Sequence, residues 1–231
     1  MIELGDIVRI NKLLSNLGIC SRKEAARYIE DGRVKVNGIL SIPGQWVEES
    51  DEILIDDEPV SAREKIYIAL NKPVGITCTA EKTVKGNIIE YMNYPEYIFP
   101  VGRLDKPSQG LIILTNDGVL ANKILESENE HEKEYIVTLD REFDEEFIKG
   151  MSSGVEICGQ VTRSCKVFRM DNNTFKIILT QGLNKQIRRM SKVFGYNVVK
   201  LERVRIMNIT LDGIESVSYT HLRAHETEAD L

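Results

Sequence analysis

The hydrophobic residues near the start of the chain recur at helical spacing. Four of them fall at i, i+3, i+4 and i+7, namely Ile10, Leu13, Leu14 and Leu17. This spacing predicts a short amphipathic helix that ends near Gly18. Ser21 and Glu24 have the spacing of a capping box, so a second helix should begin at once and stop at Gly32.

A small sheet is predicted to follow these two helices. Asn37-Gly38 lies between apolar positions and favours the positive φ angles of a hairpin turn, and residues 53–55 form an apolar run typical of a closing strand. Residues 48–64 are rich in acids and contain Pro59, which indicates the edge of a domain that continues into a linker.

The rest of the pattern contains more strands than helices. Strands are expected at residues 66–70, 111–114, 133–139, 155–157, 161–168, 175–180, 198–205 and 207–211. Helices are expected at residues 118–125, 143–151 and 185–194, the last of them capped by Asn184 and ended by Gly195. Because strands and helices do not alternate regularly, the pattern predicts an α+β domain with a mixed, mainly antiparallel sheet.

Composition indicates a protein with a packed core. Hydrophobic residues make up 42% of the 231 residues and charged residues 29%. No stretch approaches the ~20 apolar residues of a membrane span, and the start lacks a signal-peptide pattern, so we expect a cytoplasmic protein with no membrane partner. The four cysteines are scattered without a Cys-x-x-Cys pair, which predicts reduced, mostly buried thiols and no metal site: Cys20, Cys78, Cys158 and Cys165.

The distribution of charge says more than its total. A net charge of −6 argues against a nucleic-acid partner when taken alone. Basic residues nevertheless outnumber acids within residues 9–38 and again within residues 180–205, whereas the acids gather in residues 48–58 and 126–146. Two basic zones suggest two contacts to one polyanion. The alternative is that each zone is a solvated surface.

One carboxylate stands in an unusual setting. Asp105 lies between Arg103 and Lys106 in a segment bounded by Gly102 and Gly110, and the segment runs directly into the apolar residues 111–114. This arrangement presents an acid at the edge of a sheet, where it is available for chemistry. The alternative is an ordinary surface turn in which the acid pairs with a basic neighbour.

The first fifty-five residues resemble the S4 RNA-binding domain. The resemblance rests on residues 9–14, 18–25 and 32–38. It implies that five basic side chains face RNA phosphate, namely Arg9, Lys12, Arg22, Lys23 and Arg27. A generic helical hairpin with a solvated basic face is the alternative interpretation.

Four motifs in the remaining chain resemble the bacterial ribosomal RNA pseudouridine synthases of the RsuA, RluB and RluF group. They are residues 102–110, 133–135, 182–190 and 200–203, and several segments look most like the RluF branch. In this group an S4 domain precedes the catalytic domain. The resemblance implies an S4 domain at residues 8–58, a linker at 59–65 and a catalytic domain at 66–214. Residues 215–231 do not continue the pattern of the group and are a candidate non-native tail.

The resemblance also implies a reaction and the residues that perform it. The expected reaction turns a uridine of 23S ribosomal RNA into pseudouridine without a cofactor, on a monomeric protein. Asp105 would be the nucleophile, Arg188 its ionic partner and Tyr135 the platform on which the flipped base stacks. The remaining residues implied are those of the substrate pocket, Lys72, Arg103, Leu104 and Leu201, and those near phosphate, Lys185, Arg189 and Arg203.

Other functions remain open at this level. The same scaffold is compatible with a target in 16S ribosomal RNA, and transfer RNA is a further candidate substrate. A different possibility is an S4-type factor that binds ribosomal RNA without catalysis, because the chain departs from the group after residue 214.

Overall fold

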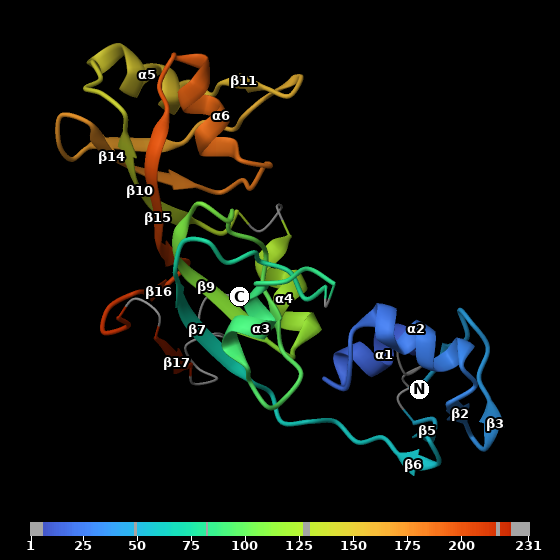
Figure 1. The fold of residues 1–231 in the computed structure, drawn as a ribbon. Coiled ribbons are helices and arrows are strands. Elements are labelled where there is room, and N and C mark those ends of the chain that lie inside the picture. The colour runs from blue at the N-terminus through green and yellow to red at the C-terminus, as the bar shows by residue number, and fades with distance from the viewer. Residues whose placement is uncertain (1–6, 49, 82, 127–129, 216–217, 223–231) are drawn as a thin grey trace. The chain divides into compact units, whose positions relative to one another are not determined.

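The computed structural model describes residues 7–48, 50–81, 83–126, 130–215 and 218–222 (Figure 1). The chain forms two compact units. The first contains the chain up to Ile66 together with Tyr94–Phe99 and Thr115–Leu120, and the second contains Tyr67–Asn93, Pro100–Leu114 and the chain from Ala121 onward.

Two short helices lie side by side in the first unit, α1 (Ile10–Asn16) and α2 (Arg22–Glu30) (Figure 1). The predicted capping box at α2 is confirmed. The Glu24 backbone N–H donates to Ser21 Oγ at 3.1 Å, and the Ser21 backbone N–H donates to the Glu24 carboxylate at 3.2 Å. These bonds satisfy two of the N–H groups that the first turn of a helix leaves without partners.

The described residues of the first unit also form short strands: β1 (Val8–Arg9), β2 (Val34–Val36), β3 (Ile39–Leu40), β4 (Trp46–Val47), β5 (Ile53–Ile55) and β6 (Glu58–Pro59). They form a sheet of order β3-β2-β5-β6 and a separate β1-β4 pair. The β2-β3 turn has positive φ at Asn37 and Gly38, as the dipeptide predicted. The inner faces of these helices and strands share one hydrophobic core that includes Ile10, Leu14 and Ala25.

The segment predicted to be a linker is bonded to the first unit. Residue 59 is already part of β6, and the Arg63 backbone N–H donates to the Leu17 carbonyl at 3.0 Å. The Asn116 side chain accepts from the Ile66 backbone N–H at 2.9 Å and donates to the Glu64 carbonyl at 2.8 Å. One amide side chain thus satisfies two backbone groups of this segment.

A mixed sheet dominates the second unit and has the order β13-β14-β10-β15-β9-β7-β17, with β8 beside β9 and β16 beside β15. Its strands are β7 (Tyr67–Lys72), β8 (Phe99–Pro100), β9 (Gln109–Thr115), β10 (Lys133–Leu139), β13 (Lys166–Arg169), β14 (Thr174–Leu179), β15 (Val198–Ile206), β16 (Ile209–Thr210) and β17 (Tyr219–His221). β15 and β9 run parallel, whereas the pairs β13-β14, β14-β10 and β10-β15 are antiparallel. A separate hairpin joins β11 (Glu156–Ile157) and β12 (Gln160–Val161). The predicted α+β class is confirmed.

The helices that accompany the large sheet in the described ranges are α3 (Ile88–Met92), α4 (Gly118–Leu125), α5 (Glu145–Ser153) and α6 (Gln186–Val193). Figure 1 shows α5 and α6 beside β10, β14 and β15, and α3 beside β7 and β9. The sequence pattern did not predict α3, whose first turn is capped by the Asn87 side chain. α5 begins two residues later than predicted, because Asp144 caps it by accepting from the Phe147 N–H at 2.9 Å.

Two local predictions are wrong. Asn184 does not cap α6: the N-cap position belongs to Lys185, which has a left-handed backbone at φ 51°, and the Asn184 side chain accepts from Arg189 instead. The strand predicted at residues 161–168 is divided between β12 and β13. The reason is that residues between the two strands bond elsewhere: the Thr162 hydroxyl accepts from the Val155 N–H, and the Cys165 N–H donates to the Ser152 carbonyl.

Part of the segment after residue 214 forms a strand. β17 pairs antiparallel with β7, with Tyr219 opposite Leu70 and His221 opposite Ile68. The sequence has no apolar periodicity that would predict this strand. It can form without one because the edge of a sheet offers backbone N–H and C=O groups that bond a neighbouring strand whatever its side chains are. The rest of the predicted tail, residues 216, 217 and 223–231, lies outside the described residues.

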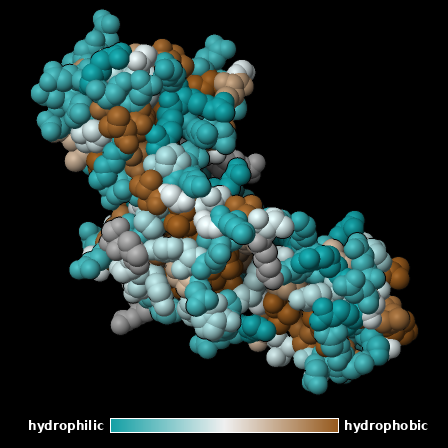
Figure 2. Space-filling model, viewed as in Figure 1, coloured by the Kyte–Doolittle hydropathy of each residue, from teal (hydrophilic) through white to brown (hydrophobic). Residues whose placement is uncertain are grey.

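The visible face of the molecule is mostly hydrophilic, and hydrophobic side chains gather at the edge of the first unit where β3 lies (Figure 2). Ile39 and Leu40 of that strand are 75% and 55% exposed. Of the helices in the described ranges, none has the length and apolar character needed to cross a membrane.

Candidate active site

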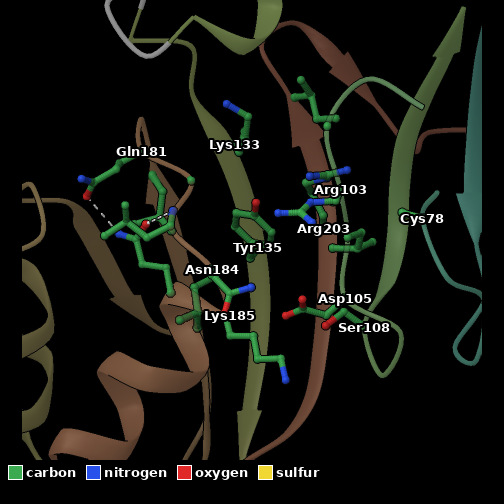
Figure 3. A pocket seen from close by; sticks show the side chains of 18 of the residues that line it. Cys78, Arg103, Asp105, Ser108, Lys133, Tyr135, Gln181, Asn184, Lys185 and Arg203 are labelled. Carbon is green, nitrogen blue, oxygen red and sulfur yellow. Dashed lines mark hydrogen bonds between the residues drawn. The ribbon is translucent and has the colours of Figure 1, made fainter. Parts of the chain in front are cut away.

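The second unit contains a cleft of about 750 Å³ (Figure 3). One wall is the loop from Val101 to Ser108, which leads into β9, and the floor is formed by β10 and β15. The segment before α6 closes the other side. The cleft therefore joins parts of all four motifs singled out in the sequence, although about one hundred residues separate the first motif from the last along the chain.

Asp105 projects from the loop into this cleft (Figure 3). The loop is closed by the Ser108 backbone N–H, which donates to the Asp105 carbonyl at 2.9 Å, and the Gly75 N–H donates to the Lys106 carbonyl at 2.8 Å. Leu104 is buried beneath the loop, whereas Arg103 is exposed at its rim. These bonds fix the backbone on both sides of a half-buried carboxylate.

Gly110 explains how the loop enters the sheet. Its φ of +108° disfavours a residue with a side chain, and a Cβ there would lie only 2.2 Å from the Arg203 carbonyl oxygen. Arg203 faces Gly110 across the parallel β9-β15 pair. Only glycine permits this approach, which brings the loop close to the floor of the cleft.

Arg188 of α6 holds the loop from the opposite side. Its guanidinium donates to Ser108 Oγ at 3.1 Å, to the Pro107 carbonyl at 3.2 Å and to the Val198 carbonyl at 2.9 Å. The expected direct ion pair with Asp105 is not present within 4.0 Å among the described residues. Burial lowers the pKa of Arg188, and the negative charge of Asp105 opposes part of that shift.

The floor of the cleft carries Tyr135 on one strand and Arg203 and Leu201 on the next. Tyr135 lies opposite Arg203 in the β10-β15 register, and Val137 lies opposite Leu201. Lys133 stands two residues before Tyr135, and both face the cleft because side chains alternate along a strand. Figure 3 shows the Arg203 guanidinium pointing toward the Tyr135 ring.

Two predicted positions differ from expectation. Lys72 is fully buried, and its Nζ donates to the Pro73 and Ile76 carbonyls at 2.8 and 3.1 Å, so it holds a turn and does not line the cleft. Arg203 is 3% exposed, and its Nε donates to the Leu111 carbonyl at 2.7 Å. Arg203 therefore lies at the floor of the cleft and not on a surface that meets phosphate.

The other basic residues expected near RNA are on the surface. On the first unit these exposed residues are Arg9, Lys12, Arg22, Lys23 and Arg27, and at the start of α6 they are Lys185 and Arg189. Arg9 lies over the Trp46 ring, 5.2 Å from its centroid.

Several side chains that line the cleft were not among the expected site residues, and Cys78, Lys133 and Gln181 are three of them. Lys133 belongs to a motif that the sequence had singled out, so its place beside Tyr135 could have been used to predict that it lines the cleft.

Comparison with known proteins identifies the family. Residues 66–192 match the RNA pseudouridylate synthase family model, and residues 8–53 match the S4 domain. The chain belongs to the RNA pseudouridine synthase family. The predicted enzyme class and the S4 domain are thereby confirmed.

Several relatives resemble this pseudouridine synthase over most of its length. Dual-specificity RNA pseudouridine synthase RluF of Escherichia coli (strain K12) is 54% identical over 210 residues, which are 90% of this chain and 72% of the relative. Ribosomal large subunit pseudouridine synthase B of Bacillus subtilis (strain 168) is 30% identical over 229 residues, which are 95% of this chain and 94% of the relative. A crystal structure of pseudouridylate synthase is 28% identical with a TM-score of 0.72, over 97% of this chain and all of that one. The predicted likeness to RluF is confirmed.

Proposed function

We propose that this synthase isomerises a specific uridine of 23S ribosomal RNA, with Asp105 as the nucleophile. The observation that carries the assignment is the position of the Asp105 carboxylate: it faces a cleft large enough for a nucleotide, on a loop held from two sides. The described residues place no ion pair on this carboxylate, so both of its oxygens are available to a substrate.

The reaction exchanges one bond for another. The bond between C1′ of the ribose and N1 of uracil breaks, the ring turns, and a bond forms between C1′ and C5. The proton on C5 leaves to a base, and N1 takes up a proton, so the sum of atoms and electrons is unchanged. Asp105 attacks the sugar or the base, or stabilises the charge that develops between these two steps.

Tyr135 is the proposed platform for the flipped base. A uridine inside folded RNA must leave its stack to reach Asp105, at a cost of a few kcal/mol. Stacking of the base on an aromatic ring contributes about 1–3 kcal/mol of binding free energy, which offsets part of this cost. Tyr135 is half-buried on β10 with its ring at the cleft, which is the exposure that a stacking face requires. Its phenol is also our candidate for moving the C5 proton.

The names of two relatives bear on the RNA target. The Bacillus subtilis relative is named a large-subunit enzyme, which supports a 23S target for this chain. The Escherichia coli relative is named a dual-specificity enzyme, which favours a second RNA substrate, and transfer RNA is our candidate. The exposed basic residues of α2 and of the start of α6 are the proposed contacts to RNA phosphate.

A mapping experiment tests the proposal. Unmodified 23S transcript is incubated with the protein, and pseudouridine is located by a chemical adduct that stops primer extension. We expect one new stop with the unchanged protein and with Asp212→Asn, a surface acid outside the cleft, and none with Asp105→Asn. Pseudouridine formed by Asp105→Asn would refute the nucleophile. A parallel incubation with transfer RNA tests the second substrate.

A further inference from the structure

The floor of the cleft holds a buried cation with an unused donor. Arg203 uses its Nε on the Leu111 carbonyl, but its Nη2 is buried and has no hydrogen-bond partner in the described ranges. A buried charged donor without an acceptor costs free energy. Such a group needs an explanation, and a catalytic role in which a ligand supplies the missing acceptor is one of them.

A second cation lies on the same face of the sheet. Lys133 lines the cleft, and its Nζ has one long hydrogen bond, of 3.3 Å, to the His131 carbonyl. Burial lowers the pKa of Lys133, and the positive charge of Arg203 lowers it further, so the two charges act on each other. Neither has an ion pair within 4.0 Å in the part of the chain that the structure describes.

The acids on either side of Lys133 in the sequence, Glu132 and Glu134, form ion pairs with other residues. Glu134 faces away from the cleft and pairs with Arg205 at 3.1 Å and with Lys176 at 3.7 Å. Glu132 pairs with Arg205 at 2.8 Å and with Lys166 at 2.9 Å. Glu202, beside Arg203 on β15, pairs with Lys200 at 2.8 Å. The two acids that line the cleft, Asp105 and Glu126, make no ion pair with Arg203 or Lys133 within 4.0 Å among the described residues. The cation pair of Arg203 and Lys133 therefore has no ion-paired protein counter-charge at a position beside Tyr135, where the base is proposed to stack.

The substrate supplies such a counter-charge during the reaction. When the C1′–N1 bond breaks, its electron pair stays with N1, and the uracil ring becomes an anion whose charge spreads onto its O2 and O4 carbonyl oxygens. An anion formed away from water needs preorganised donors, and enzymes place them where charge develops. The base enters such a pocket more deeply than its phosphate does when a nucleotide is flipped.

We propose that Arg203 and Lys133 bind the carbonyl oxygens of the flipped uracil and stabilise the negative charge that the ring gains when the C1′–N1 bond breaks. This role rests on the proposed function of the cleft. The charge is transient, because the same electrons form the C1′–C5 bond in the next step and the C5 proton then leaves. Arg203 and Lys133 are thus catalytic residues distinct from the nucleophile.

Single-turnover kinetics test the proposal with Arg203→Lys, Lys133→Gln and, as a matched control on β15, the exposed Lys200→Gln. RNA binding is measured separately. Removing one donor from an oxyanion hole costs about 10²–10³ in rate, so we expect at least ~100-fold slower conversion with an unchanged Kd for the first two variants. Lys200→Gln should convert RNA at the normal rate. If Arg203→Lys fails to fold, by circular dichroism, Lys133→Gln carries the test alone.

A substrate whose uracil ring is a better leaving group distinguishes this catalytic role of Arg203 and Lys133 from a purely structural one. Fluorine at C5 withdraws electrons and stabilises the uracil anion, so a target 5-fluorouridine needs less help from the protein. Cleavage is followed as loss of the 5-fluorouridine nucleoside after digestion. We expect the defects of Arg203→Lys and Lys133→Gln to shrink at least ~10-fold with this substrate.

Two outcomes would overturn the proposal. Equal defects with both substrates would show that the residues only support the fold. A raised Kd with a salt slope smaller by about 1, and a normal rate once RNA is bound, would assign them to a backbone phosphate. Asp105→Asn is measured in the same series, to distinguish this failure from a failure of the proposed function. If Asp105→Asn still converts the RNA, Asp105 is not the nucleophile, whatever the Arg203 and Lys133 variants show.

Discussion

Gly110→Ala tests the close approach of β9 to β15 that sets the active-site loop. The new Cβ would lie 2.2, 2.7 and 2.9 Å from the carbonyl oxygen, nitrogen and carbonyl carbon of Arg203, all of them backbone atoms. Overpacking of this kind costs about 1–3 kcal/mol, and a positive φ adds roughly 1–2 kcal/mol. Alanine returns about 0.4–1 kcal/mol by restricting the unfolded chain. The net loss should be roughly 1–5 kcal/mol of unfolding free energy.

The matched control is Gly159→Ala. Gly159 also has a positive φ, +75°, but a Cβ there would meet nothing within 4 Å, so this variant has the backbone strain without the clash. Urea unfolding is followed by far-ultraviolet circular dichroism, because the only tryptophan, Trp46, lies in the first unit. We expect Gly110→Ala to lose at least ~1 kcal/mol more than the control, as the low end of the overpacking cost, and to form pseudouridine more slowly. Equal losses for the two variants would refute the reasoning.

Three further substitutions have defined outcomes. Ser21→Ala removes the capping box of α2 and should cost about 1 kcal/mol, measured by tryptophan fluorescence in urea. Arg188→Lys cannot make the two hydrogen bonds to the active-site loop and the one to the Val198 carbonyl together. Single-turnover conversion should therefore slow at least ~10-fold, because the loop and Asp105 are misplaced, while the Kd for RNA stays within about 3-fold. Hydrogen bonds from Lys166 and Arg205 lower the pKa of Glu132 below its usual 4.5. Its carboxylate therefore stabilises the fold above pH 4.5 and loses this effect as the pH falls through the lowered value. Glu132→Gln should be less stable than the unchanged protein at pH 7, and urea unfolding in acid should show that difference vanish.

The sequence by itself determined the features that local chemistry controls. The capping box at Ser21, the hairpin at Asn37-Gly38 and the apolar strand runs depend on neighbours a few residues away. The structure has the capping box, the hairpin and most of the predicted strands. Ordered motifs around Asp105 and Tyr135 were enough to indicate the family and the class of reaction, because a reactive group and its immediate context lie in one stretch of chain.

Tertiary structure decided what depends on distant partners. Lys72 was expected in the substrate pocket and Arg203 near phosphate, but backbone carbonyls bind both of them, and the partner of Arg203 is Leu111, about ninety residues away. Arg188 was expected to pair with the Asp105 charge and instead holds the Asp105 loop. The parallel β9-β15 contact, possible only because Gly110 lacks a side chain, brings these groups together. Burial and partner choice follow from packing across the sheet, and a linear pattern of residue types does not contain that packing.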